Sequence, residues 1–204
     1  MTVLYAANPS TQAVRDQMNA GHLVCISTPK QGNRIPEDAL VCLDNGVFGK
    51  GYPGDEKWLA WVTKHQPIAD RVIFVVAPDV VGDAAATLER SRPFLPIIRD
   101  LGFPAAFVAQ DGLEDLDVPW DEFDVLFIGG STEWKLGPHV LPLIREAKAR
   151  GKWVHAGRVN SKRRFAYFEL LGCDSADGTY IAFGPDINLP TVLHWTQSLF
   201  GATA

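Results

Sequence analysis

The sequence predicts an α/β fold, specifically a compact (β/α)8 TIM-like barrel that forms a single domain. Short apolar runs alternate with helical patterns about eight times along the 204 residues. Most of these runs are continuously apolar, as expected for strands that are covered on both faces in a parallel sheet. The chain is 47% hydrophobic and 21% charged, which is enough to bury one sizeable core. Eight alternations favour a closed barrel over a doubly wound sheet.

The strands are predicted from runs rich in Val, Ile, Leu, Phe and Ala. In chain order they span residues 3–7, 23–28, 40–44, 72–79, 105–111, 125–130 and 153–157, with a last short strand near Cys173. The helices are predicted between them, at residues 10–21, 55–66, 83–102, 139–151 and 163–172. Several of these segments begin with Ser or Asp, which cap helix amino termini, and end with Gly, which is typical after the last helical turn.

Nothing in the chain indicates a second domain or a membrane segment. No linker, low-complexity tract or internal repeat interrupts residues 1–204, and no apolar run approaches the roughly 18 to 20 residues that span a bilayer. The amino terminus also lacks a signal-peptide pattern. We therefore expect a cytoplasmic protein, in the host cytoplasm if a phage encodes it. The three cysteines are scattered without a CxxC pair, which predicts buried thiols and no metal site.

Charge is distributed unevenly along the chain. The formal net charge of −5 argues weakly against non-specific binding of nucleic acid, because phosphate contacts depend on Lys and Arg. Residues 145–164 are nevertheless strongly basic, whereas residues 111–124 are acidic. The basic stretch is a candidate nucleic-acid contact, and the acidic one is a possible docking surface for a protein partner.

Polar side chains and glycines follow most of the predicted strands, where the active sites of such barrels lie. The candidates are Asp44, Asp79, Asp83, Gln110, Asp111, Gly129, Gly130, His155, Arg158, Asp174 and Asp177. Helix capping and tight turns explain some of these residues individually. Paired carboxylates among amides and glycines also suit chemistry at a sugar C1′, where one carboxylate attacks and the other moves a proton.

These motifs resemble the tRNA-guanine transglycosylases and, more closely, their phage and bacterial relatives that insert 7-deazaguanines into DNA. The resemblance covers most of the chain from about Leu43 onward. The segment LDNGVF is similar to the family's acid/base motif, which implies Asp44 as the acid/base carboxylate and Phe48 as the aromatic that stacks on the base. The segment GCDSADGT is similar to the one that carries the nucleophile, which implies Asp177.

Other segments complete the resemblance. APDVVGD, VAQDG and FIGGS are similar to base-binding segments, which implies base contacts by Asp79, Gln110, Gly129 and Gly130. VHAGRVNSKRR is similar to the basic stretch of the DNA-acting branch, and the implied nucleic-acid contacts are His155, Arg158, Asn160, Lys162, Arg163 and Arg164. The chain lacks the family's zinc cluster and RNA-binding domain, and has Asn45 and Val47 where the family has Ser and Gly.

The resemblance therefore implies a pentosyltransferase that exchanges guanine in DNA for a free 7-deazaguanine base. The reaction would run through a covalent intermediate on Asp177, without a cofactor or metal, with a protein partner or a homo-oligomer possible. Two other interpretations remain open. One is a hydrolase or deoxyribosyltransferase of small nucleosides, which needs no basic stretch. The other is a non-catalytic barrel that binds nucleic acid or regulates a partner enzyme.

Overall fold

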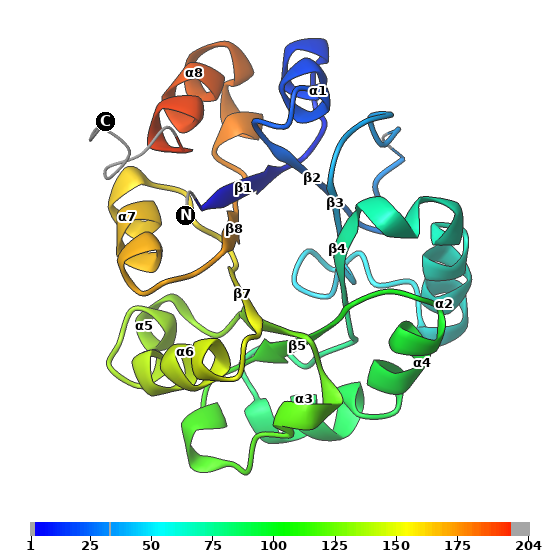
Figure 1. The fold of residues 1–204 in the computed structure, drawn as a ribbon, viewed down its shortest axis with the longest axis vertical. Coiled ribbons are helices and arrows are strands. Elements are labelled where there is room, and N and C mark those ends of the chain that lie inside the picture. Colours follow the sequence, from blue (N-terminus) through cyan, green and yellow to red (C-terminus); the bar gives the residue numbers. More distant parts are fainter. Residues whose placement is uncertain (1–2, 33, 197–204) are drawn as a thin grey trace.

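Eight parallel strands form a closed barrel in the computed structural model of the protein, which describes residues 3–32 and 34–196 (Figure 1). The strands are β1 (Leu4–Ala7), β2 (Val24–Ser27), β3 (Val41–Leu43), β4 (Val72–Val76), β5 (Ala105–Ala109), β6 (Val125–Ile128), β7 (Trp153–Ala156) and β8 (Ser175–Asp177). The barrel closes where β8 pairs with β1, with Leu4 opposite Ser175 and Ala6 opposite Asp177. The predicted (β/α)8 barrel is confirmed.

Helices surround the strands, as Figure 1 shows. They are α1 (Gln12–Asn19), α2 (Asp55–Thr63), α3 (Ala84–Ser91), α4 (Phe94–Asp100), α5 (Thr132–Lys135), α6 (Val140–Ala149), α7 (Lys162–Leu170) and α8 (Pro185–Thr196). Short 3₁₀ helices join them at η1 (Gln66–Arg71), η2 (Leu113–Asp115), η3 (Trp120–Glu122) and η4 (Ile181–Phe183). No helix among residues 3–32 and 34–196 is long and apolar enough to cross a membrane.

The strands are apolar on both faces because they carry two cores. One apolar cluster fills the barrel interior and includes Phe74, Val76, Val108 and Phe127. The larger cluster lies between the strands and the helices. Side chains alternate between the two along each strand, so residues two apart on one strand share a face. A barrel interior packed in this way is a core rather than a pore, and a binding site can form only at its end.

The helices differ from the predicted ones at three places. The segment 83–102 forms α3 and α4 rather than one helix, because Pro93 lacks the N–H that a continuous helix would need there. Helices α5 and α8 were not predicted. The first has only four residues, and the second carries Pro190 inside it, which argues against a helix in the sequence.

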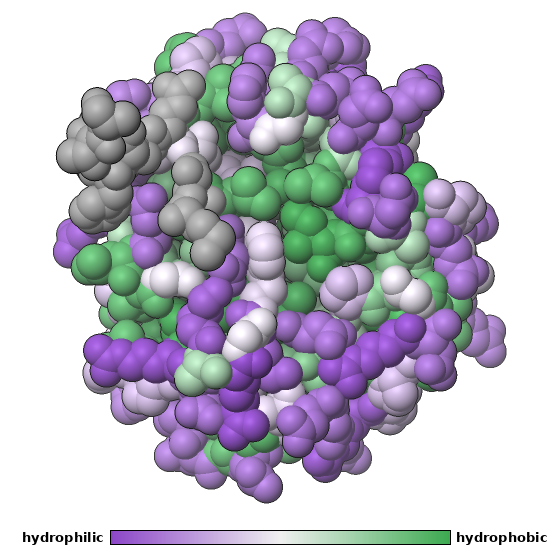
Figure 2. Space-filling view, viewed as in Figure 1, coloured by the Kyte–Doolittle hydropathy of each residue, from purple (hydrophilic) through white to green (hydrophobic). Residues whose placement is uncertain are grey.

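The two ends of the barrel differ. Figure 2 shows the molecule in the same view as Figure 1. Apolar side chains gather over the centre of the barrel, and polar ones cover most of the surrounding helices. Asp174 lies at the amino end of β8, where its carboxylate is 2.7 Å from the Lys148 ammonium and accepts a hydrogen bond from the Val154 N–H. Asp177 lies at the opposite end of the same strand. Asp174 and Asp177, the two carboxylates of the segment GCDSADGT, thus lie at opposite ends of the barrel.

Candidate active site at the carboxyl end of the barrel

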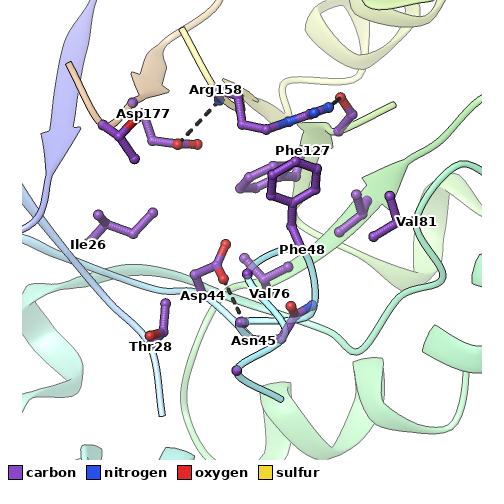
Figure 3. Close-up of a pocket in the computed structure, with 18 of the residues that line it drawn as sticks. Ile26, Thr28, Asp44, Asn45, Phe48, Val76, Val81, Phe127, Arg158 and Asp177 are labelled. Atoms are coloured by element: carbon purple, nitrogen blue, oxygen red, sulfur yellow. Dashed lines mark hydrogen bonds between the residues drawn. The ribbon is translucent and has the colours of Figure 1, made fainter. Parts of the chain in front are cut away.

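A pocket of about 610 Å³ opens at the carboxyl ends of the strands. Loops that follow all eight strands contribute to its lining. Its apolar wall comes from the barrel interior and includes Ile26, Val76 and Phe127. Asp44 and Asp177 face each other across the pocket from β3 and β8 (Figure 3). Both predicted catalytic carboxylates therefore belong to one site.

Asp44 lies directly after β3 and is held by the turn that follows. Its backbone N–H donates to the Ser27 carbonyl at 2.8 Å, and its Oδ1 accepts the Gly46 N–H at 2.7 Å. Burial raises the pKa of the Asp44 carboxyl to about 7; the Gly46 N–H opposes this shift and the nearby charges of Asp177 and Asp79 add to it. Near neutral pH this group can therefore both donate and accept a proton.

Asp177 ends β8, where the His155 ring and one backbone N–H contact its carboxylate. Oδ2 lies 3.0 Å from Nε2 of His155, and Oδ1 accepts the backbone N–H of Arg158 at 3.3 Å. The next residue, Gly178, lets the β8 loop approach the β7 loop closely. A Cβ at this position would overlap the Tyr5 hydroxyl and lie 2.5 Å from Oδ1 of Asn160. A side chain at position 178 would thus displace the loops that frame Asp177.

Asp79 and Gln110 line the pocket but use most of their polar atoms internally. The Asp79 oxygens accept hydrogen bonds from the Asn45 amide at 2.8 Å and the Gln110 amide at 2.6 Å. Oε1 of Gln110 accepts the N–H groups of Gly82 and Gly130, each at 3.0 Å. Burial raises the pKa of Asp79, and the two amides oppose that shift. This network connects the loops after β3, β4, β5 and β6.

The carbonyls of the paired glycines are engaged by Arg158, and Gly129 also lines the pocket. Nη2 of Arg158 donates to the carbonyls of both Gly129 and Gly130. The guanidinium carbon of Arg158 also lies 4.2 Å from the centre of the Phe48 ring, whose residue is 61% exposed. This is a cation–π contact, and it covers one face of the predicted stacking residue (Figure 3).

The residues predicted to contact nucleic acid separate into three groups. His155 is fully buried in the barrel interior, so no polymer can reach it in this structure. Arg158, Asn160 and Arg164 line the pocket. Lys162 and Arg163 are exposed on the first turn of α7 and do not line it. Three of the six predicted contacts therefore line the pocket.

The acidic stretch 111–124 is partly neutralised within the chain. Glu122 pairs with Arg92 at 2.8 Å, and Asp124 pairs with Arg99 at 2.7 Å. Asp111 accepts hydrogen bonds from the backbone and hydroxyl of Ser131, and Asp83 caps α3 by accepting the Ala86 N–H. The last two were strand-end candidates, and both have structural roles here.

The sequence analysis missed Lys30, Lys135 and Ser175. Lys30 lines the pocket from the loop after β2. Lys135 is fully buried on α5 and donates to the Gly157 carbonyl. Burial lowers its pKa to about 7, with a further lowering from the Arg158 charge. Ser175 shares the inward face of β8 with Asp177, so the two-residue alternation of the strand could have identified it. No group of three or more potential metal ligands occurs within the described part of the chain.

Comparisons with known proteins support the fold alone. No family model matches the chain, and no curated protein matches it. An HpcH/HpaI aldolase from Desulfitobacterium hafniense DCB-2 is similar with a TM-score of 0.55 and 11% identity, over 100% of this chain and 95% of that one. Tryptophan synthase subunit alpha from Legionella pneumophila str. Paris is similar with a TM-score of 0.51 and 9% identity, over 96% and 88%.

These findings contradict the identification with the guanine transglycosylases, and the assignment as a DNA-modifying glycosyltransferase falls with it. The interpretations as a nucleoside enzyme or a non-catalytic nucleic-acid-binding barrel gain no support from them either. The motifs misled for a physical reason. Acidic residues and glycines at strand ends suit the loops of any such barrel, and here the supposed base-reading groups of Asp79, Gln110, Gly129 and Gly130 bond to one another or to Asn45 and Arg158.

Proposed function

We propose that the protein is an enzyme that moves a proton on a small anionic carbonyl compound, in an isomerase-type or lyase-type reaction. One observation carries the proposal: Asp44, with a pKa raised to about 7, faces Asp177 across a pocket of about 610 Å³. A general acid or base works best when its pKa is near the working pH. Two carboxyls in different environments commonly divide such work between them.

In this proposal, Asp44 takes a proton from the carbon next to the substrate carbonyl. The electron pair of the broken C–H bond moves toward the carbonyl oxygen, where negative charge develops. In an isomerisation of a hydroxy-carbonyl compound, Asp44 returns the proton to the former carbonyl carbon, while the hydroxyl on the deprotonated carbon passes its proton to the former carbonyl oxygen and becomes the new carbonyl. In a cleavage, the electron pair forms a C=C bond to the β carbon and breaks the bond from that carbon to the leaving group, which takes the proton from Asp44. Asp177 holds a substrate hydroxyl from the opposite side of the pocket.

Cations at the pocket support an anionic substrate. Lys30, Arg158 and Arg164 all line the pocket. The Arg158 guanidinium is oriented by the glycine carbonyls and the Phe48 ring, so it needs little reorganisation to stabilise a developing oxyanion. The apolar wall of Ile26, Val76 and Phe127 would cover the carbon skeleton and strengthen these charge interactions by excluding water.

The name of the aldolase fits a reaction of this class, although that similarity extends only to the fold. The proposal therefore rests on the geometry of the two carboxylates. The evidence for the reaction comes from the residues of the site and not from the barrel fold, because one fold hosts many reactions.

Solvent exchange tests the proposal directly. The protein is incubated in D2O with a panel of keto acids, hydroxyketones and phosphorylated aldehydes and ketones, and deuterium at carbon is followed by NMR and mass spectrometry. We expect exchange into at least one compound and a loss of roughly 100-fold or more in Asp44→Asn. Asp83→Asn is the matched control, because Asn caps a helix as well as Asp does. The proposal fails if Asp44→Asn exchanges at the wild-type rate, or if the folded wild type exchanges none of the panel.

A further inference from the structure

Three polar side chains form a buried hydrogen-bonded chain that leads to Asp177 from inside the barrel. Nε1 of Trp153 lies 2.8 Å from Oγ of Ser175. That oxygen lies 2.7 Å from Nδ1 of His155, whose Nε2 is 3.0 Å from Oδ2 of Asp177. His155 and Ser175 are both fully buried. The chain therefore connects the amino end of β7 with the pocket.

Strand register places these side chains together. Trp153 and His155 are two residues apart on β7, and Ser175 and Asp177 are two residues apart on β8. His155 pairs with Ser175 across the two parallel strands. Since side chains two apart share a face, all four point into the barrel. The arrangement follows from the sheet and needs no loop to maintain it.

The chemistry of the four groups determines the direction of each hydrogen bond. The indole N–H of Trp153 can only donate, so Oγ of Ser175 accepts from it. The Ser175 side chain is fully buried, and Nδ1 of His155 is the acceptor that the structure gives its hydroxyl hydrogen. When the hydroxyl donates to Nδ1, that nitrogen carries no hydrogen. The imidazole proton is left on Nε2, where it donates to the Asp177 carboxylate. The opposite tautomer would place the lone pair of Nε2 against that carboxylate.

The apolar surroundings of His155 stabilise this set of hydrogen bonds, because water cannot replace a partner that is lost. Its ring centre lies 4.6 Å from that of Phe127 and 5.0 Å from that of Phe74. Both phenylalanines belong to the apolar interior of the barrel. A polar group left without a partner in such a place is costly, so each member of the chain keeps the next in its orientation.

We propose that Trp153, Ser175 and His155 are positioning residues. Trp153 and Ser175 fix His155 with its proton on Nε2, and His155 thereby holds the Asp177 carboxylate in one orientation. The catalytic consequence rests on the proposed function, in which Asp177 binds the substrate opposite Asp44. The tautomer of His155 does not rest on it and can be measured without substrate.

The test is ¹⁵N NMR of the full chain with labelled histidine, with the His155 signals assigned by their absence in His155→Gln. We expect a pyrrole-type Nε2 and a pyridine-type Nδ1 in the wild type. Ser175→Ala removes the donor to Nδ1 and is expected to shift both signals. Trp153→Phe, which leaves the serine hydroxyl in place, is expected to shift them less. Trp120→Phe and Ser91→Ala change a tryptophan and a buried serine outside the chain and are expected to leave them unchanged.

Kinetics of the exchange reaction then separate a positioning role from a merely structural one. We expect Ser175→Ala to lower kcat/KM by about tenfold or more, because the Asp177 carboxylate that holds the substrate loses its fixed orientation, whereas Ser91→Ala keeps the wild-type value. A wild-type His155 protonated on Nδ1, or His155 signals that Ser175→Ala does not shift, would overturn the proposal. Absence of any exchange with the expected tautomer present would instead refute the proposed function and leave the hydrogen-bonded chain standing.

Discussion

Asp44 and Asp177 carry the same carboxyl group in two different settings. Asp44 has one backbone N–H partner and lies half-buried in the pocket wall, where desolvation raises its pKa to about 7. Asp177 is held between the Arg158 N–H and Nε2 of His155. Asymmetry of this kind lets one carboxyl exchange protons with a substrate while the other keeps a fixed orientation. The difference arises from neighbouring groups and not from the residue type.

Lys135 provides a prediction on stability. Its folded-state pKa of about 7 lies below the ordinary value of 10.5. Between these pH values the unfolded chain binds more protons than the folded chain, so the free energy of unfolding rises with pH, by up to about 1.4 kcal/mol per unit. Below about pH 7 the buried Lys135 is charged, and the full free-energy cost of burying that charge lowers the stability of the folded chain. Lys135→Met removes the titrating group, so its stability relative to the wild type is expected to be greatest at pH 7 and to decline toward pH 9.

Urea unfolding of the wild type and Lys135→Met at pH 7, 8 and 9 measures this effect. Lys57→Met, which replaces an exposed lysine of α2, is the control and should follow the wild type across the range. Parallel pH dependence in the wild type and Lys135→Met would show that Lys135 does not titrate in this window.

At the residue scale, the sequence analysis placed Asp44 and Asp177 correctly at one end of the barrel, because a residue that follows an apolar run lies at a strand end. It could not assign partners. Nothing in the segment VHAGRVN shows that the His155 side chain points into the barrel and Arg158 into the pocket. Lys135 was missed because its one-turn helix has no periodic pattern from which its burial could be read.

Among the elements, the loop after β7 connects the β6 and β8 sides of the pocket through Arg158. Arg158 has a positive φ of 60°, which is unusual for a residue with a side chain. In this conformation its N–H points to Asp177 while its guanidinium reaches the carbonyls of Gly129 and Gly130. The backbone strain is thus offset by contacts that organise the pocket.

A pair of substitutions isolates this strain. Arg158→Gly and Arg158→Ala both lose the guanidinium, but only glycine adopts a positive φ without cost. We expect Arg158→Gly to be the more stable of the two by up to about 1 kcal/mol. Arg164 lies inside helix α7, so there the alanine variant should be the more stable by about the same amount. Urea unfolding of the four variants checks both signs, and equal stability of the two Arg158 variants would show that its backbone is not strained.

The element predictions were best for the strands. Continuously apolar runs identified β1 to β7, which are covered on both faces, whereas β8 (Ser-Ala-Asp) was expected only as a short strand near Cys173. The segment 83–102 was predicted as one helix because its apolar pattern continues past Pro93, although the backbone cannot. Helix α8 was missed because its prolines indicate a break, whereas packing of Leu189, Val192 and Trp195 on the barrel stabilises it.

At the scale of the whole molecule, barrel closure creates the site. Asp44 and Asp177 are separated by most of the sequence, and only the pairing of β8 with β1 brings their strands near each other. The fold could be predicted because it depends on a pattern repeated along the chain. The family could not, because it depended on a few short motifs that suit many barrels.

The most direct test of the central claim is the pKa of Asp44, measured by ¹³C NMR of labelled aspartate side chains between pH 4 and 9. We expect one carboxyl carbon to titrate near pH 7 in the wild type and to be absent in Asp44→Asn. Its pKa should fall in Asp177→Asn, because the charge on Asp177 contributes to the raised value. If every aspartate instead titrates below about pH 5, as ordinary carboxyls do, Asp44 is not a proton carrier at neutral pH and the proposed chemistry is wrong.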